Sequence, residues 1–153
     1  MMTELRVNGR VVQVDVAPDT PLLDVLRNTL RLTGSRYGCG LEQCGSCMVL
    51  LDGEPAFSCV REVGSLHGHE ITSVEALAGH PLIEAFIEEQ AGQCGYCLSG
   101  MLISAKALLD RTPNPSREEI VTALDRNLCR CGTHTRIIRA VQRAAALMSK
   151  VAA

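Results

Sequence analysis

Hydrophobic and polar residues alternate along the first stretch of the chain. Leu5 and Val7 flank a charged residue, Asn8-Gly9 follows, and residues 11–16 alternate in the same way. Alternation with a period of two is typical of a half-buried strand. Asn-Gly between two such runs favours a hairpin with a type I′ turn, because both of its residues tolerate positive φ. The pattern therefore predicts an antiparallel β-hairpin.

A helical period replaces this alternation after Thr20. Thr20 is suited to cap a helix, and Pro21 to occupy its first position. Gly34 is expected to end the helix. Leucines recur between these signals at the spacing that buries one helix face, namely Leu22, Leu23, Leu26 and Leu30. One amphipathic helix is therefore predicted.

More strands are expected beyond this helix. Residues 48–51 form an apolar run, Asp52-Gly53 is a second turn signal, and a short strand follows that ends near Cys59. Residues 70–74 favour one more strand before a helical turn at 75–77. A hairpin, a helix and further strands make a small mixed sheet with one helix packed across it. The expected fold of this part is a β-grasp of the ferredoxin kind.

The composition changes near Gly79-His80-Pro81, where the pattern becomes helical. Ser116 and Glu119 form the S-x-x-E capping box that marks the start of a helix. The predicted helices cover residues 81–90, 99–109, a segment capped by Ser116, and 135–148. Four helices in such a short segment favour a compact four-helix bundle. The overall expectation is an α+β protein with domains at residues 1–79 and 80–153.

Composition and charge argue against several classes of partner and location. The 153 residues are 46% hydrophobic, and their net charge is −2 with acids and bases interspersed. This balance argues against nucleic acid or an anionic membrane as the main partner. No run approaches the roughly 18 apolar residues of a membrane span. The first residues lack the apolar block of a signal peptide, so a cytoplasmic location is expected.

Four cysteines occupy the middle of the first half. Four, two and eleven residues separate Cys39, Cys44, Cys47 and Cys59. This C-x4-C-x2-C spacing with a distant fourth cysteine is that of a plant-type [2Fe–2S] site. Glycines in the loop allow backbone N–H groups to approach the sulfurs. The alternatives are a zinc site, which usually uses two short hooks, and a pair of disulfides.

The other four cysteines form two short hooks before predicted helices. Two residues separate Cys94 from Cys97, and one separates Cys129 from Cys131. Helix N-termini favour thiolates and anionic groups, since they carry partial positive charge and free N–H donors. Two short hooks are equally typical of zinc, so spacing alone leaves this site open between zinc and iron–sulfur. Without an export signal, metal binding explains eight cysteines better than disulfides do.

Three histidines lie near these cysteines. His67 and His69 form an H-x-H sequence on a loop that contains Gly64 and Gly68. Because four cysteines already complete the neighbouring site, both are interpreted as solvated loop residues. His134 is expected to be a partly exposed turn residue without a derivable role.

Taken together, these motifs resemble the small iron–sulfur subunit of molybdenum hydroxylases, the xanthine oxidase and aldehyde oxidoreductase family. The resemblance spans nearly the whole chain in the expected order. It rests on YGCGLEQCGSCMV at 37–49, Cys59, QCGYCLSGM at 93–101, TPNPS at 112–116 and NLCRCGTHTRI at 127–137. It implies two [2Fe–2S] clusters, and so favours iron at the second site as well. The sequences of the last three motifs resemble those in the small subunits of bacterial enzymes that act on N-heteroaromatic compounds such as nicotinate or isoquinoline.

The resemblance also implies roles for particular residues. The cluster of Cys94, Cys97, Cys129 and Cys131 would lie near a molybdenum cofactor held by a partner large subunit. Gln93 matches a glutamine that hydrogen-bonds the pterin, and Cys131 matches a ligand that also contacts it. The cluster of Cys39, Cys44, Cys47 and Cys59 would pass electrons outward to a flavoprotein or a cytochrome.

The implied reaction is hydroxylation of an aldehyde or an N-heteroaromatic ring with oxygen from water. The molybdenum centre of the large subunit would carry out this chemistry, and the present chain would relay the electrons singly. The chain is not expected to be catalytic alone. Two alternatives differ in class, a free-standing ferredoxin and a zinc protein that scaffolds an assembly.

Overall fold

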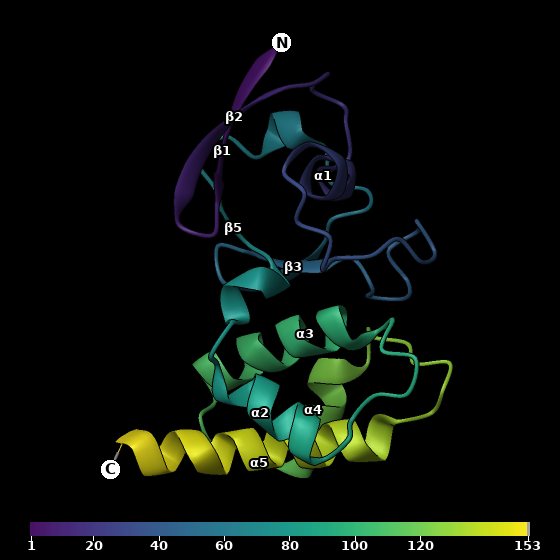
Figure 1. Ribbon diagram of the computed structural model, residues 1–153, viewed down its shortest axis with the longest axis vertical. Coiled ribbons are helices and arrows are strands. Elements are labelled where there is room, and N and C mark those ends of the chain that lie inside the picture. Colours follow the sequence, from purple (N-terminus) through teal and green to yellow (C-terminus); the bar gives the residue numbers. More distant parts are fainter. Residues whose placement is uncertain (153) are drawn as a thin grey trace.

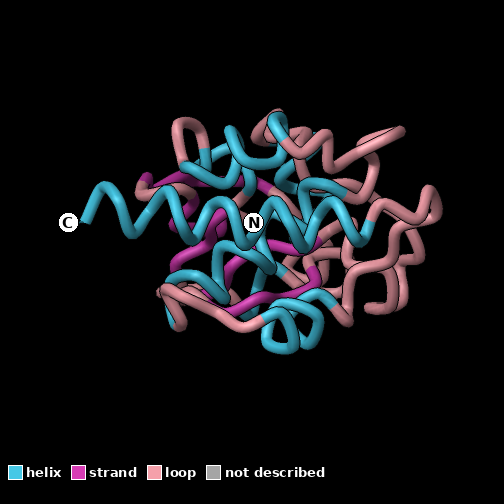
Figure 2. The backbone as a smooth tube through the Cα atoms, turned by 90° about the horizontal axis from the view of Figure 1, so that it is seen from below, coloured by secondary structure: helices cyan, strands magenta, loops and turns pink. Residues whose placement is uncertain are grey.

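The computed structural model describes residues 1–152 as an α+β fold with two stacked parts (Figure 1). The first half of the chain forms a mixed sheet with a helix packed against it, and the second half forms a layer of helices. The two termini lie at opposite ends of the molecule, with the last helix crossing the end away from the sheet (Figures 1 and 2). Within the described residues, no helix combines the length and apolar character needed to cross a membrane.

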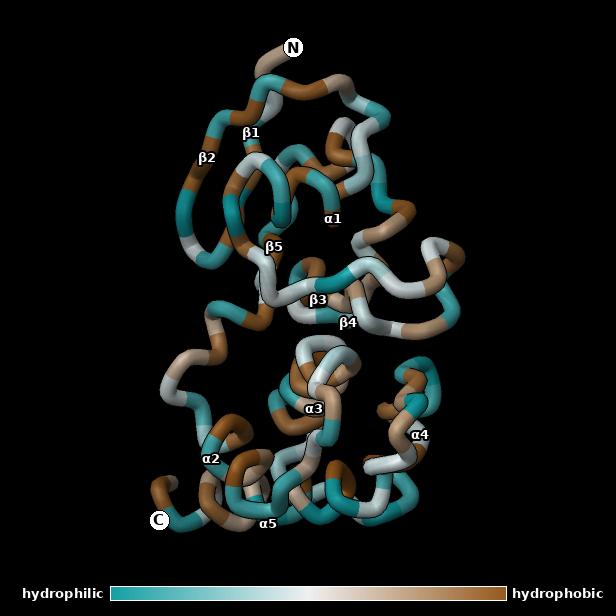
Figure 3. The backbone as a smooth tube through the Cα atoms, turned by 45° about the vertical axis from the view of Figure 1, so that its right-hand side comes forward, coloured by the Kyte–Doolittle hydropathy of each residue, from teal (hydrophilic) through white to brown (hydrophobic). Residues whose placement is uncertain are grey.

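The sheet has five strands in the order β2-β1-β5-β3-β4. The neighbours β1 and β5 are parallel, whereas the other neighbouring pairs are antiparallel. The strands are β1 (Met2–Val7), β2 (Arg10–Asp15), β3 (Met48–Leu51), β4 (Glu54–Phe57) and β5 (Glu70–Thr72). Polar and apolar residues alternate along the first hairpin (Figure 3). The mixed sheet expected from the sequence is therefore present.

Both predicted hairpin turns are confirmed. Asn8 and Gly9 have φ values of 52° and 75°, and Asp52 and Gly53 have φ values of 51° and 84°. Two consecutive positive φ angles define the type I′ turn, whose twist matches that of the flanking strands. The short 3₁₀ turn at Val74–Leu77 after β5 also matches the prediction.

The first helix differs from its prediction at both ends. It comprises α1 (Leu22–Asp24) and a π-helical continuation, η1 (Val25–Thr29). Thr20 does not cap it, because the N–H groups of Leu22 and Leu23 already donate to the carbonyls of Arg61 and Ser58. The helix also ends before Gly34, since Arg31 adopts the left-handed conformation with φ 60°.

The second half contains the helices that the sequence predicts, with small shifts at their ends. They are α2 (Pro81–Glu88), α3 (Leu98–Arg111), α4 (Arg117–Leu124) and α5 (His134–Ala152). The capping box of α4 is present, with Ser116 and Glu119 each accepting a backbone N–H of the other. His134 is an exposed residue in the first turn of α5, rather than a turn residue before the helix.

Two apolar cores lie on the two faces of β3, and one of them is shared by the sheet and the helical layer. On β3, Met48 and Leu50 pack against the helical layer, whereas Val49 faces the core under the first helix. Side chains on a strand alternate between its faces, so a strand buried on both sides is a continuous apolar run. The sequence MVLL meets this requirement. The shared core holds the cysteine loops of the two halves against each other.

Candidate metal centres

The first cysteine loop turns its backbone N–H groups toward sulfur. The N–H groups of Leu41, Gln43 and Cys44 point at the Sγ of Cys39 at 3.2–3.3 Å. Cys39 in turn donates its own N–H to the Sγ of Cys44 at 3.3 Å. Such a concave set of N–H groups stabilises negative charge on sulfur. Partial burial opposes ionisation, but the three donors lower the pKa of Cys39 to about 7.

The other two cysteines of this set point into the protein. Cys47 precedes β3, Cys59 follows β4, and both are buried. Burial, together with the adjacent thiol of Cys59, raises the pKa of Cys47 to about 11. The hydroxyl of Ser58 donates to the carbonyl of Cys47 at 2.6 Å and ties the two segments together. The β3–β4 hairpin thus returns the distant fourth cysteine to the loop.

The second set is assembled from two segments at the starts of helices. Cys97 is the N-cap residue of α3, and Cys129 and Cys131 lie shortly before α5. Burial opposes ionisation of Cys129, but the hydroxyl and N–H of Thr133 lower the pKa of its thiol to about 7. The Sγ of Cys129 and the Oγ1 of Thr133 lie 3.3 Å apart.

The remaining thiols of this set differ in exposure. The N–H of Tyr96 points at the Sγ of Cys94 at 3.5 Å and lowers the pKa of this exposed thiol. Burial raises the pKa of Cys97 to about 12, and the neighbouring Cys129 adds to the increase. Each set therefore contains thiols that face solvent and thiols that face the core.

The sulfurs are arranged in pairs. Thiols that shift one another's pKa are neighbours, and they form the pairs Cys39 with Cys44, Cys47 with Cys59, Cys94 with Cys131 and Cys97 with Cys129. All eight cysteines are free, so neither set forms disulfides. Among residues 1–152, no group of three or more His, Cys, Asp or Glu is spaced to hold a single metal ion. Two pairs with N–H donors at their outer sulfurs fit an anionic cluster that takes two cysteines per iron.

Cysteines of both sets line one small cavity. Its volume is about 320 Å³, and its lining includes Cys39, Cys44, Cys94, Cys97 and Cys129. The chain segments on its two sides are joined by a backbone hydrogen bond, in which the N–H of Leu128 donates to the carbonyl of Cys44 at 2.8 Å. The two sites are therefore adjacent.

Side chains that the sequence analysis did not select also join the two sites. The hydroxyl of Tyr96 donates to the carbonyl of Tyr37 at 2.5 Å, and Arg36 donates to the carbonyl of Gly95 at 2.6 Å. The guanidinium of Arg36 also lies 5.2 Å from the centre of the Tyr96 ring, a cation–π contact. Both residues lie close to cysteines in the sequence, and this proximity could have singled them out. The sequence does not show which loop each side chain reaches.

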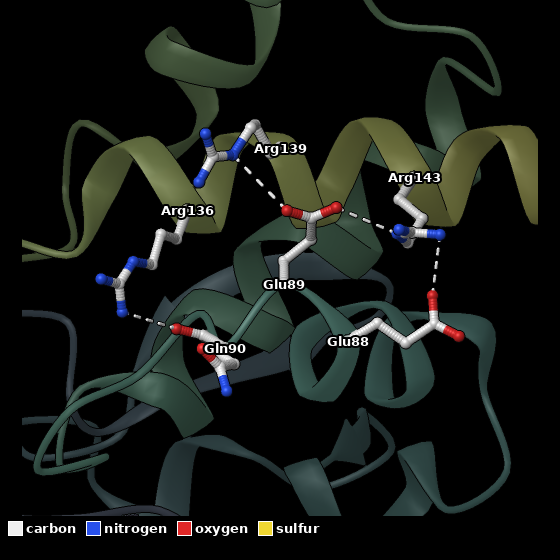
Figure 4. A network of polar contacts seen from close by, with 6 residues as sticks. All are labelled: Glu88, Glu89, Gln90, Arg136, Arg139 and Arg143. Atoms are coloured by element: carbon white, nitrogen blue, oxygen red, sulfur yellow. Dashed lines mark hydrogen bonds and ion pairs between the residues drawn. The ribbon is translucent and has the colours of Figure 1, made fainter.

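Gln93 is exposed immediately before Cys94. It lines a groove of about 560 Å³ whose apolar wall includes Ile87 and Leu98 and whose polar rim includes Arg136. Arg136 donates to the carbonyl of Gln90. Further along α5, two arginines bind the end of α2, with Arg139 on Glu89 and Arg143 on Glu88 and Glu89 (Figure 4). These contacts hold α2 beside the segment that carries Gln93.

The histidine pair is only partly as expected. His67 is exposed, but Nδ1 of His69 lies 2.5 Å from a carboxylate oxygen of Asp52. The other oxygen of Asp52 accepts the N–H of Glu70 at 2.8 Å. The hydrogen bonds from His69 and from the N–H of Glu70 lower the pKa of Asp52. His69 thus fastens the β3–β4 turn to β5 and is not merely solvated.

Comparisons with known proteins agree with this pairing of two sites. A model of the 2Fe-2S iron-sulfur cluster binding domain matches residues 5–71, and a model of the [2Fe-2S] binding domain matches residues 70–142. The chain is 57% identical over 145 residues to one of the subunits of nicotinate dehydrogenase from Pseudomonas putida, covering 92% of each. It is 47% identical over 148 residues to the alpha chain of isoquinoline 1-oxidoreductase from Brevundimonas diminuta, covering 94% of this chain and 97% of that one.

The structural comparison gives the same result. A chain of quinoline 2-oxidoreductase from Pseudomonas putida 86 superposes with a TM-score of 0.93 at 35% identity. The match covers 98% of the present chain and 96% of the other. The chain therefore belongs to the family of small [2Fe–2S] subunits of molybdenum hydroxylases, the non-catalytic iron–sulfur subunits of oxidoreductase complexes.

Proposed function

We propose that this chain relays electrons one at a time from a molybdopterin centre in a partner large subunit to a flavin or cytochrome acceptor. The observation that carries this proposal is that cysteines of both sets line one cavity and that a backbone hydrogen bond between Leu128 and Cys44 joins their loops. Two adjacent one-electron sites within one chain suit a relay.

The proposed ligands follow the two sets. Cys39, Cys44, Cys47 and Cys59 would hold one [2Fe–2S] cluster, and Cys94, Cys97, Cys129 and Cys131 the other. When bound, each cluster supplies reversible one-electron chemistry. The N–H groups directed at Cys39 and Cys94, and the Thr133 hydroxyl at Cys129, would stabilise negative charge on the ligands and tune the reduction potential.

We assign electron arrival to the second set. Gln93 and Cys131 would contact the pterin, since Gln93 is exposed and lines the groove beside Arg136, and Cys131 is half-buried. The exposed side chains in this region leave the site open to a docked partner. Cys94 is likewise exposed, so little protein separates the second set from such a partner.

The first set would then be the point of departure. Leu41, which lies in its loop between Cys39 and Cys44, is 68% exposed, and its N–H points at the Sγ of Cys39. An acceptor docked on this loop would lie close to the outer sulfur pair. The acceptor would be a flavoprotein or a cytochrome.

The partner would perform the chemical step, hydroxylation of a ring or aldehyde carbon with oxygen from water. Such a step inserts oxygen between carbon and hydrogen and releases two electrons and two protons. The names of the relatives, nicotinate dehydrogenase and isoquinoline 1-oxidoreductase, support an N-heteroaromatic substrate. An aldehyde is the other substrate class that we propose.

We also propose the finer description of the architecture. The boundary between the domains would lie after Gly79, which adopts φ 81° and directly precedes His80, the N-cap residue of α2. The mixed sheet with one helix across it supports a β-grasp for residues 1–79, and α2–α5 support a four-helix bundle for residues 80–153. Eight free thiols suit a reducing compartment, which supports a cytoplasmic location.

Metal analysis and spectroscopy of the purified full chain test this proposal. Two [2Fe–2S] clusters require four irons and four inorganic sulfides per chain and two distinct EPR signals after reduction. Stoichiometric zinc with no visible absorbance would contradict the proposal. Full iron content with stable redox cycling, but no association with a molybdenum-containing partner in its native complex, would instead favour a free-standing ferredoxin.

A further inference from the structure

The loop of the first cysteine set packs directly on the helix that begins at the second set. A Cβ atom on Gly100 of α3 would overlap the carbonyl oxygen of Gly45 and lie 2.8 Å from its carbonyl carbon. Because both atoms belong to the backbone, no side-chain movement would make room. Gly100 therefore permits the close approach between the two sites.

The buried side chain of Asn127 also packs at the contact between Gly45 and Gly100. Asn127 is 5% exposed, and its Oδ1 accepts the hydroxyl of Ser104 on α3 at 2.7 Å. Its Nδ2 would lie 2.5 Å from a Cβ added to Gly45, a residue whose φ of 78° already favours glycine. Asn127 thus occupies the corner between α3, the first cysteine loop and the segment that leads to Cys129.

Two further hydrogen bonds hold the same two regions together. The Ser99 hydroxyl donates to the carbonyl of Ser46 at 3.3 Å, and the N–H of Leu128 donates to the carbonyl of Cys44 at 2.8 Å. Both bonds link the loop of one set to a residue within two positions of a cysteine in the other. The spacing of the two sets thus depends on a few close contacts.

We propose that Gly45, Gly100 and Asn127 are positioning residues that set the separation of the two clusters and so the rate of electron transfer between them. This inference rests on the proposed ligand assignment and deepens it. In the step concerned, one electron would pass from a cluster held by the second set to a cluster held by the first. No bond forms or breaks, and no proton moves. The rate of such a step falls steeply with distance, so the backbone contact governs it.

Gly100→Ala in the full chain carrying both clusters tests the inference. The added methyl group should push the Gly45 loop off α3 without touching a ligand. We expect weaker magnetic coupling between the two reduced clusters in low-temperature EPR. We also expect electron transfer between the clusters to slow a few-fold, because tunnelling weakens with each added ångström of separation. The g values of each separate cluster should stay unchanged.

Gly64→Ala is the matched control. A Cβ there also meets crowded atoms, with the Cβ and carbonyl oxygen of Pro18 at 2.8 and 3.0 Å, but it has no atom of either cysteine loop among its nearest neighbours. It should lower thermal stability yet leave the coupling at the wild-type value. Wild-type coupling and wild-type transfer rate in Gly100→Ala would overturn the inference.

If Gly100→Ala loses iron or fails to fold, Ser104→Ala decides the question. This variant removes the hydroxyl that holds Asn127 and adds no bulk, so it should weaken the coupling in the same direction by a smaller factor. Unchanged coupling in Ser104→Ala would then overturn the inference. The underlying function fails separately, because wild-type protein without four irons and two EPR signals would contradict the ligand assignment itself.

Discussion

The two cysteine sets have similar surroundings although they are built from different local structures. In the first set, one glycine-containing loop supplies three cysteines and a hairpin returns the fourth. In the second, the starts of two helices supply two cysteines each. Each nevertheless has a thiol with a pKa of about 7, at Cys39 and at Cys129, where polar groups oppose the effect of burial.

The different origins of the cysteines explain why one metal site can be recognised from its sequence and the other cannot. Spacing is diagnostic when most ligands lie on one loop, because the short chain between them fixes where the sulfurs can go. It is ambiguous when two helices supply the ligands, since the packing of those helices decides which cysteines meet. Cys97 and Cys129 are paired only because α3 and α5 belong to the same core.

The largest expected effect comes from replacing one cysteine in each set, because each replacement should remove only one cluster. Cys129→Ser should remove the second cluster and disturb the docking of the molybdenum-containing partner, whereas Cys39→Ser should remove the first cluster and block transfer to the acceptor. Each variant should lose about half of the iron and one of two EPR signals. Iron analysis, EPR and reduction assays on the complex measure these losses.

The two variants also test the order of the relay. Normal turnover of the Cys39→Ser complex with its natural acceptor would show that the first set is not the point of departure. Loss of both EPR signals in either variant would show that the two sites fold as one unit.

Core substitutions distinguish the two parts of the molecule by their effects on unfolding free energy and hydrogen exchange. Met48, 1% exposed, packs in the core shared by the sheet and the helices, whereas Leu5, 0% exposed, belongs to the core of the sheet part. Either residue changed to Ala should cost about 2–5 kcal/mol of unfolding free energy. Met48→Ala should reduce the hydrogen-exchange protection of both parts, and Leu5→Ala chiefly that of the strands. Equal protection patterns in the two variants would contradict the assignment of separate cores.

The smallest effect concerns pH at the start of the helical part. Nδ1 of His80 accepts the N–H of Leu82 and caps α2. Burial, together with the charge of Lys106, lowers the pKa of His80. The unfolded chain therefore binds this proton more readily than the folded one. The cap contributes fully above the unfolded pKa of about 6.5, and this contribution is lost as pH falls through the folded pKa.

Melting curves between about pH 5 and pH 8 measure this contribution. His80→Asn keeps a capping acceptor but has no titratable group. Its melting temperature should decline less on acidification than that of the wild type. Parallel declines would show that other groups account for the whole pH dependence.

Features that depend on neighbouring residues in the sequence were predicted well. The type I′ turns follow from Asn8-Gly9 and Asp52-Gly53, and the capping box follows from Ser116 and Glu119. The prediction for Thr20 was wrong, because carbonyls from a segment some forty residues away satisfy the N–H groups that it would have capped. The role of His69 was missed for the same reason, since its partner Asp52 lies on another loop.

The amino-acid sequence alone was enough to predict the two kinds of cysteine spacing, the strands and helices that carry them, and the resemblance that indicates iron. Local rules suffice there, because turn, capping and ligand patterns act over a few residues. The folded structure was needed to show that cysteines of both sets line one cavity and that Gly45 lies against Gly100. Contacts between backbone atoms leave little trace in the pattern of side chains, so the distance between the two sites comes from the packing of the sheet on the helices.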